Sequence, residues 1–180
     1  MFMGNQASAR EHLEQGISHL ELQEHRALAL RFGEEPTCSA LAISAKNLWL
    51  LGYPDQFLIQ LQKALELAQE VAHPFTSATI QAFAAMVLLE SRDFQSALHY
   101  AEATIELSQE QRFPFWVGVA SMCVGACWAR QGRTLEGIES IIQGSTGIVR
   151  SGALLVHPPS VVFLAEAHLI SGLAEDGRKH

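Results

Sequence analysis

Apolar residues recur at intervals of three and four positions along most of this chain, in stretches that short polar or glycine-containing breaks separate. This spacing is typical of amphipathic α-helices, which turn one apolar face towards a core. It predicts about eight main helices, over residues 6–19, 37–51, 54–71, 75–90, 94–111, 115–131, 134–151 and 159–171. Pro54, Pro74 and Pro114 stand at helix starts, where the missing amide hydrogen costs no helical hydrogen bond. The expected fold class is therefore all-α.

The breaks between these stretches are regularly spaced. Glycine or arginine occupies positions 52, 92, 132 and 172, which are 40 residues apart, and each position closes an apolar stretch. A fixed period of this length indicates one repeated supersecondary unit, and the helix pattern makes that unit a hairpin of two antiparallel helices. A single hairpin cannot bury its apolar face, so it requires neighbours that stack on it.

Small residues recur where the two helices of each hairpin are expected to cross. Relative to the turn, they fall seven residues before it (Ala45, Ala85, Gly125, Ala165), five after it (Ala97, Gly137, Gly177) and twelve after it (Ala64, Thr104, Gly144). Phe57 departs from this rule, whereas Ala9 and Gly16 obey it in the first helix. Small residues at the crossing, with larger apolar residues between them, indicate helices packed ridge into groove.

The pattern defines one repeat domain over residues 1–180. Its parts are a half repeat over 4–22, an irregular connection over 23–36, repeats over 37–73, 74–113 and 114–157, a half repeat over 158–172, and a tail over 173–180. The connection is expected to hold a short extra helix near 25–30, which His25 and Arg26 anchor through hydrogen bonds to Glu34, Glu35 or backbone carbonyls. Internal glycines Gly144 and Gly147 are expected to make their helix the weakest, at about 1 kcal/mol each.

Composition narrows the classes of function. With 180 residues and 48% hydrophobic content, the chain can bury the core of one domain. A net charge of −7 and only 12 scattered Lys and Arg residues argue against nucleic-acid binding. The apolar runs are too short and too interrupted to span a membrane. Three cysteines, an odd number, without a cationic and apolar leader favour the reducing cytoplasm.

Residues with catalytic or metal-binding chemistry do not form a recognisable constellation. His12 and His19 share a helix face, but no ligand four residues away completes a pair. Cys123 and Cys127 lie four apart, which suits a soft metal or a redox pair, but buried apolar fillers are the favoured interpretation. His168 is interpreted as a partly buried, hydrogen-bonded side chain rather than a ligand. We therefore expect no enzyme activity, no catalytic residues, no cofactor and no metal site.

Several local strings, taken in order, carry a family resemblance. They are HLEQG (12–16), HRALA (25–29), FGEEP (32–36), LWLLGYPDQ (48–56), HPF (73–75), RDF (92–94), FPFW (113–116) and QGR (131–133). In this order and spacing, residues 7–172 resemble the C-terminal tetratricopeptide-like (TPR-like) region of large bacterial predicted ATPases. Those signal-transduction proteins carry an adenylate or guanylate cyclase domain, or sometimes a kinase or DNA-binding domain, at their other end.

The resemblance implies a right-handed superhelical array of helix hairpins, a TPR-like α-solenoid. It also implies a non-catalytic scaffold that senses or binds a partner, while an upstream nucleotide-binding domain and an output domain carry out the chemistry. Neither a phosphate-binding loop nor a cyclase-like pair of aspartates occurs in this sequence. The chain is therefore expected to be one piece of such a protein, and its partner to be a protein or peptide, including the ATPase or cyclase domains of the same parent.

In a TPR-like array, the first helix of each hairpin lines the concave side. The expected partner-binding residues are Lys46, Trp49, Leu50, Met86, Leu89, Glu90, Met122, Arg130 and Glu166. This apolar surface with a few charges suits an extended or helical peptide, anchored by Trp49 and Met86. Two alternatives stay open: Trp49 and Met86 fill gaps between repeats, or the chain is a structural spacer that self-associates through exposed terminal helices.

Overall fold

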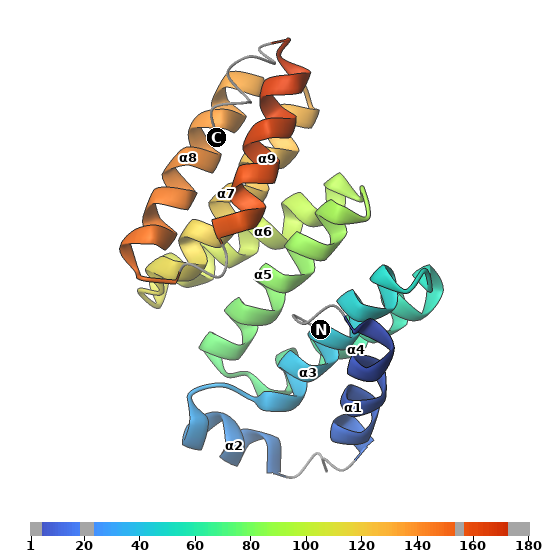
Figure 1. Ribbon diagram of the computed structural model, residues 1–180. Coiled ribbons are helices and arrows are strands. Elements are labelled where there is room, and N and C mark those ends of the chain that lie inside the picture. Colours follow the sequence, from blue (N-terminus) through green and yellow to red (C-terminus); the bar gives the residue numbers. More distant parts are fainter. Residues whose placement is uncertain (1–4, 19–23, 154–156, 173–180) are drawn as a thin grey trace. The chain divides into compact units, whose positions relative to one another are not determined.

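A computed structural model describes residues 5–18, 24–153 and 157–172 (Figure 1). Within these ranges the backbone forms nine α-helices and no strand. They are α1 (Gln6–Ser18), α2 (His25–Phe32), α3 (Pro36–Leu50), α4 (Pro54–Val71), α5 (Pro74–Glu90), α6 (Phe94–Glu110), α7 (Pro114–Arg130), α8 (Thr134–Arg150) and α9 (His157–Ile170). The all-α class is confirmed. Every main helix and the short extra helix are present, and the ends of the main helices differ by at most two residues from the prediction.

The turns between helices repeat at half the predicted period. From Gly52 onwards, residues with positive φ fall every 20 positions, at Gly52, Ala72, Arg92, Arg112, Gly132, Gly152 and Gly172, whereas Gly33 at the end of α2 lies outside this series. At four of these turns the next amide bonds to a carbonyl five residues back, for example Tyr53 N to Leu48 O at 2.9 Å and Asp93 N to Leu88 O at 2.9 Å. This hydrogen bond satisfies a carbonyl that the helix end leaves unpaired. The connection inside a hairpin and the one between hairpins therefore use the same backbone device.

The chain divides into two compact units, Met1–Ala84 and Ala85–His180, and the boundary falls inside α5. In the first unit, α3, α4 and the first half of α5 share a buried core of Cys38, Leu41, Ala42, Ala64, Ala68 and Ile80. Helix α1 packs against α3. The Asn47 side-chain amide, buried on α3, donates to the Gln6 side-chain oxygen at 2.7 Å and fastens the start of α1. Phe57, the large residue at a crossing position, is buried too.

In the second unit, α7 and α8 touch through glycines. A Cβ on Gly118 would lie 2.8 Å from the Gly144 carbonyl oxygen, and a Cβ on Gly137 would lie 2.5 Å from the Gly125 carbonyl oxygen. Real Cβ atoms do not approach oxygen this closely, so the two backbones can be this near only because no side chain stands between them. The crossing positions Gly125, Gly137 and Gly144 thus behave as predicted.

Other crossing residues differ from the expectation. Gly16 on α1 is exposed, and a Cβ there would meet nothing within 4 Å, so no helix crosses at this position. The structure also gives Gly144 a packing role that its helix propensity alone does not suggest. Gly177 lies outside the described residues. Among the described helices, none has both the length and the apolar composition that crossing a lipid bilayer requires.

Candidate functional site

The second unit holds a cleft between α5, α6, α7 and α9. Its volume is about 230 Å³, and its lining residues are Leu89, Glu90, Arg92, Phe94, Ala126, Arg130, Val162, Phe163 and Glu166. Four of the nine predicted partner-binding residues, Leu89, Glu90, Arg130 and Glu166, lie in this lining. They come from three helices that are separated in the sequence, and the fold brings them to one place.

The apolar residues of the cleft lining differ in how far they are buried. Leu89, Ala126 and Phe163 are buried, so they belong to the packed interior of the unit and fix the shape of the recess. Phe94 is half-buried, and Val162 has 56% of its surface exposed. The recess therefore has a rigid interior side and an accessible apolar edge, the combination that receives an apolar group from solution.

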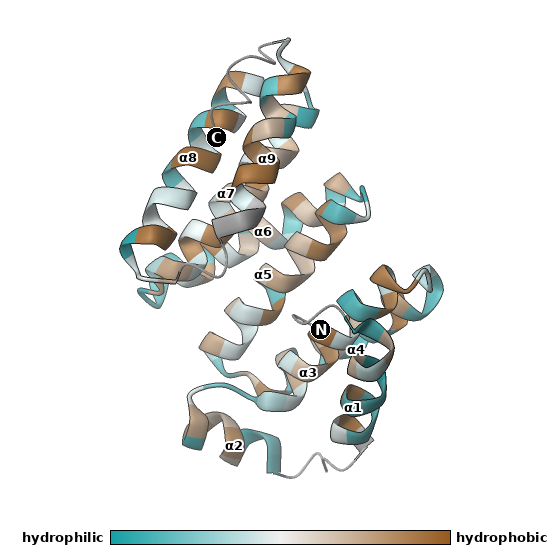
Figure 2. Ribbon diagram, in the orientation of Figure 1, coloured by the Kyte–Doolittle hydropathy of each residue, from teal (hydrophilic) through white to brown (hydrophobic). Residues whose placement is uncertain are grey.

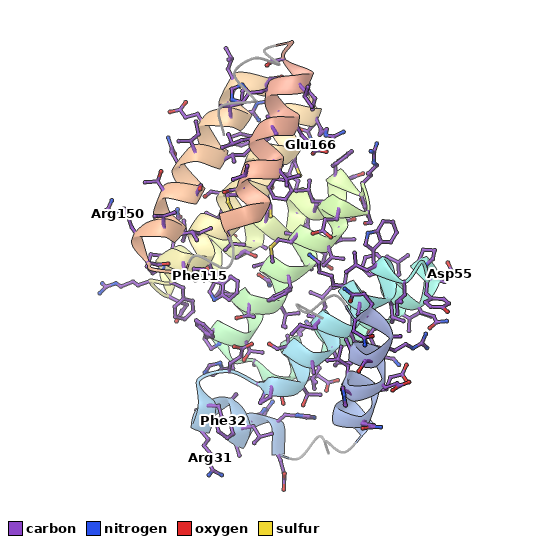
Figure 3. All side chains as sticks on the ribbon, viewed as in Figure 1. Arg31, Phe32, Asp55, Phe115, Arg150 and Glu166 are labelled. Carbon is purple, nitrogen blue, oxygen red and sulfur yellow. The ribbon has the colours of Figure 1, made fainter. Side chains whose placement is uncertain are left out.

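Arg130 organises the charged side of the cleft. Its guanidinium forms an ion pair with the Glu166 carboxylate at 2.9 Å, and it lies 5.3 Å from the centre of the Phe94 ring. Figure 3 labels Glu166 on α9. Because both side chains of the ion pair keep contact with solvent, the pair contributes modestly to stability, of the order of 0–1 kcal/mol. Its main effect is to hold one cation and one carboxylate in defined positions beside the recess.

The local sequence explains why these residues meet. Leu89 and Glu90 end α5, Phe94 begins α6, and the turn at Arg92 joins them. Arg130 ends α7 at the position that lies 40 residues after Glu90. The regular repeat thus places the last turns of α5 and α7 beside each other in the same register, and α9 supplies the third wall.

The other predicted residues of this unit have different surroundings. Met122 is fully buried, and its side chain packs where α8 crosses α7 at Gly144. Met122 does not line the cleft, because its position in α7 faces the partner helix of the hairpin. Met86 is half-buried and packs against the core cluster around Ala85 and Ala101. This contact matches the alternative interpretation, in which Met86 fills a gap between helices.

Three predicted residues lie in the first unit. Lys46 and Trp49 are half-buried on α3, and Leu50 is half exposed at its end. The Trp49 ring packs against the Phe57 ring of α4, with 5.7 Å between the ring centres. Trp49 therefore takes part in holding its own hairpin together.

Sequence reasoning missed Arg92, Phe94, Val162 and Phe163 as cleft residues. Phe94 belongs to the second helix of its hairpin, whereas the predicted concave surface uses only first helices, although Phe94 also ends the string RDF at 92–94. Val162 and Phe163 lie earlier in α9 than Glu166, the predicted partner-binding residue of that helix. A search for apolar residues within four positions of each predicted charged residue would have found Phe94, which lies four residues after Glu90.

A second polar cluster, in the first unit, is fully buried. The Glu35 carboxylate accepts hydrogen bonds from Cys38 N at 2.6 Å and Thr37 Oγ1 at 2.8 Å, and it meets His25 Nδ1 at 2.8 Å. The Glu35 amide donates to Thr76 Oγ1 of α5 at 3.0 Å. Glu35 thus caps the start of α3 and ties α2 and α5 to it.

Its partners determine the pKa of Glu35. Burial alone would raise this pKa, but the hydrogen bonds from the Cys38 amide, the Thr37 hydroxyl and His25 stabilise the carboxylate and outweigh burial, so the pKa falls below its ordinary value. Arg26 of α2 also donates to the Glu70 carbonyl oxygen at 3.0 Å. The prediction that His25 and Arg26 anchor the irregular connection is confirmed by these contacts, and the cluster is a structural clamp.

The three cysteines are buried and carry no disulfide. Burial raises the pKa of Cys127 to about 11 and raises that of Cys38 and Cys123 further. These thiols therefore stay protonated at neutral pH, as apolar fillers do. In the part of the chain that the structure describes, no group of three or more His, Cys, Asp or Glu side chains is arranged to hold a metal ion.

Comparison with known proteins adds no relative: no family model matches the chain, and no curated protein matches it significantly. The resemblance to the TPR-like regions of bacterial ATPases therefore stays a prediction.

Proposed function

We propose that this chain is a non-catalytic interaction module that binds a segment of a protein or peptide in the cleft between α5, α6, α7 and α9. One observation carries the proposal: Leu89, Glu90, Arg130 and Glu166, selected from the sequence as partner-binding residues, line a single recess in the folded unit. Apolar walls beside fixed charges are the combination that anchors and orients a peptide.

The size of the recess indicates what it receives. Pockets that enclose small-molecule ligands commonly measure roughly 300–1,000 Å³. At about 230 Å³ this cleft is smaller, which suits one apolar side chain projecting from a longer segment. The side chain would enter against Leu89, Phe163 and Val162, while charged groups of the segment would meet Arg130 and Glu166.

We also propose the wider setting. The 40-residue period and the ordered strings support a right-handed TPR-like array that belongs to an ATPase-linked or cyclase-linked bacterial signalling protein. In that setting the module works in the cytoplasm, and its partner is another protein or the catalytic domains of the same parent. Its mechanism is presentation of a preformed surface, so binding requires little rearrangement of the helices.

The test begins with selection of peptides from a random library displayed on phage, using the immobilised chain. Enriched peptides are synthesised, and their affinities are measured by fluorescence anisotropy for the wild-type chain and for Arg130→Ala. The matched control is Arg133→Ala. Arg133 also forms an ion pair, with Glu136, and lies 4.1 Å from the centre of an aromatic ring, that of Trp128, but it does not line the cleft.

We expect Arg130→Ala to weaken binding by roughly tenfold, as the loss of one charge-assisted contact does, and Arg133→Ala to leave it unchanged. Peptides that bind both variants equally, or a library that yields no binder, would count against the cleft. Those results would favour the alternative of a structural spacer without a ligand of its own.

A further inference from the structure

The first helix of a hairpin uses one face to hold the helix that follows it. In α7 this face consists of Gly118, Met122, Gly125 and Ala129, all of which are buried. Helix α8 lies directly on them: a Cβ on Gly137 would lie 2.8 Å from Ala129 N, and a Cβ on Gly144 would lie 2.9 Å from Met122 Cγ. These four positions therefore define a seat for a helix.

Most of the same positions are buried in the earlier hairpins, although Trp49 of α3, the counterpart of Ala129, is half-buried. Eighty residues before the α7 seat, Cys38 and Ala42 of α3 are fully buried and share a core cluster with Ala64 and Ala68 of α4. Forty residues before it, Ala85 and Leu89 of α5 are buried, and Ala85 shares a cluster with Ala101 of α6. In each case the helix that comes next in the chain contributes to the covering.

Helix α9 repeats this face and leaves it open. Forty residues after Met122, Gly125 and Ala129 stand Val162, Ala165 and Leu169. Val162 is 56% exposed, Leu169 is 64% exposed and Ala165 is half-buried. Figure 2 shows that apolar residues cover most of α9. Ala165 and Leu169 have the same residue types as Ala85 and Leu89, which form part of the seat in α5.

We propose that this face of α9, formed by Val162, Ala165 and Leu169, binds an amphipathic α-helix of about 17 residues. That length is the one that α6 and α8 have. The surface also continues an existing interface, because α9 already packs against α7 and α8. The geometry of the occupied seats specifies the partner.

The partner helix carries small residues seven positions apart, as Ala97 and Thr104 are in α6 and Gly137 and Gly144 are in α8. Between them it carries a buried apolar residue, as Ala101 and Ile141 are. It runs antiparallel to α9, as the second helix of a hairpin does. A helix with large residues at both small positions could not approach closely enough to cover Ala165.

The probe is a fluorescently labelled peptide with the sequence of residues 93–110, because α6 covers the seat whose residues match those of α9. Its binding to the full chain is followed by anisotropy. A control peptide carries Ala101→Glu, which places a charge on the apolar face. Two chain variants make the same chemical change at exposed leucines: Leu169→Glu on α9, and Leu30→Glu on α2, where the side chain is 81% exposed. Circular dichroism checks that both fold.

We expect the peptide to bind the wild-type chain and Leu30→Glu equally, and Leu169→Glu on the order of tenfold more weakly or worse. The Ala101→Glu peptide is expected not to bind. Failure of the probe to bind the wild-type chain, or equal binding to both variants, would overturn the proposal. A concentration-dependent dimer that Leu169→Glu abolishes in sedimentation would overturn it as well, because the occupant would then be a second copy of this chain. Val162 belongs to this face and also lines the cleft, whereas Leu169 does not line the cleft. Leu169→Glu therefore tests this face, and Arg130→Ala tests the proposed function separately.

Discussion

Two glycines on α8 are expected to respond in opposite directions to the same substitution. Replacing Gly144 with alanine adds a Cβ that would overlap the Gly118 carbonyl oxygen and lie 2.9 Å from Met122 Cγ and 3.0 Å from Met122 N. Two of these three atoms belong to the backbone of α7 and cannot rotate away. The helices must therefore separate, or α8 must shift along α7, and either movement loosens the contacts around Met122.

The magnitude follows from two opposing terms. Alanine is better than glycine inside a helix by about 1 kcal/mol. Forcing an extra carbon into a well-packed contact typically costs about 1–3 kcal/mol, and more where the backbone has to move. For Gly144→Ala the packing term is expected to exceed the propensity term, and the free energy of unfolding to fall by about 1–2 kcal/mol.

Gly147 provides the matched control, because it lies on the same helix, one turn further on. A Cβ there would meet only Gly118 Cα, at 4.0 Å, which is an ordinary van der Waals distance. The propensity term then acts alone, and Gly147→Ala is expected to stabilise the chain by about 0.5–1 kcal/mol. The two variants have the same composition, so differences in the unfolded state largely cancel between them.

Urea denaturation, followed by circular dichroism and by tryptophan fluorescence, measures both variants. Trp116 and Trp128 lie on α7, so fluorescence reports on the helix that Gly144 touches. We expect the urea midpoint to fall for Gly144→Ala and to rise for Gly147→Ala. If both midpoints rise, the backbones of α7 and α8 are not as close as described, and the explanation of the small-residue pattern fails.

Three further expectations concern the turns, the buried clamp and the thiols. Arg112 has φ 60°, which costs a non-glycine residue of the order of 1 kcal/mol, so Arg112→Gly is expected to raise the urea midpoint, whereas Gly132→Ala at φ 89° is expected to lower it. Because the pKa of Glu35 is depressed in the folded chain, its stabilising effect is present above its ordinary pKa of 4.5 and is lost as pH falls through the folded value. Unfolding curves from pH 6 to pH 3 should therefore show wild-type stability falling more steeply than that of Glu35→Gln. With all three thiols buried, a disulfide reagent at pH 8 is expected to label the native chain slowly and to titrate three thiols at once in denaturant; rapid native labelling at Cys127 would contradict its raised pKa.

The helices were predictable because their signal is local. Apolar periodicity, proline at helix starts and small residues at the crossings each depend on neighbours a few positions away. The turns were predictable only in part. Glycine marks positions 52 and 132, but Ala72 and Arg112 adopt the same left-handed conformation without a residue type that announces it. At Ala72 and Arg112 the residue type therefore gives no sign of the left-handed turn that the backbone adopts.

The cleft-lining residues were predictable where their distance from a turn sets their direction. Glu90 and Arg130 end their helices at equivalent positions, and both border the cleft. Phe94 was missed because it enters the cleft from the other helix of its hairpin, through a contact with Arg130 that only the fold creates. A side chain's distance along its own helix does not reveal which neighbouring helix it will meet.

Met122 and Val162 show the physical limit of this reasoning. They stand 40 residues apart at the same position of their helices, and a periodic argument has to treat them alike. The structure separates them: Met122 is fully buried under α8, whereas Val162 on α9 is 56% exposed and borders the cleft. The two residues differ because a helix covers the face of α7 that holds Met122, whereas none of the described helices covers Val162 in the same way. This difference depends on the neighbouring segment and not on the residue itself. Where a helix hairpin recurs, the same sequence position is therefore buried in one hairpin and exposed in another, and only the packing of the next helix decides between them.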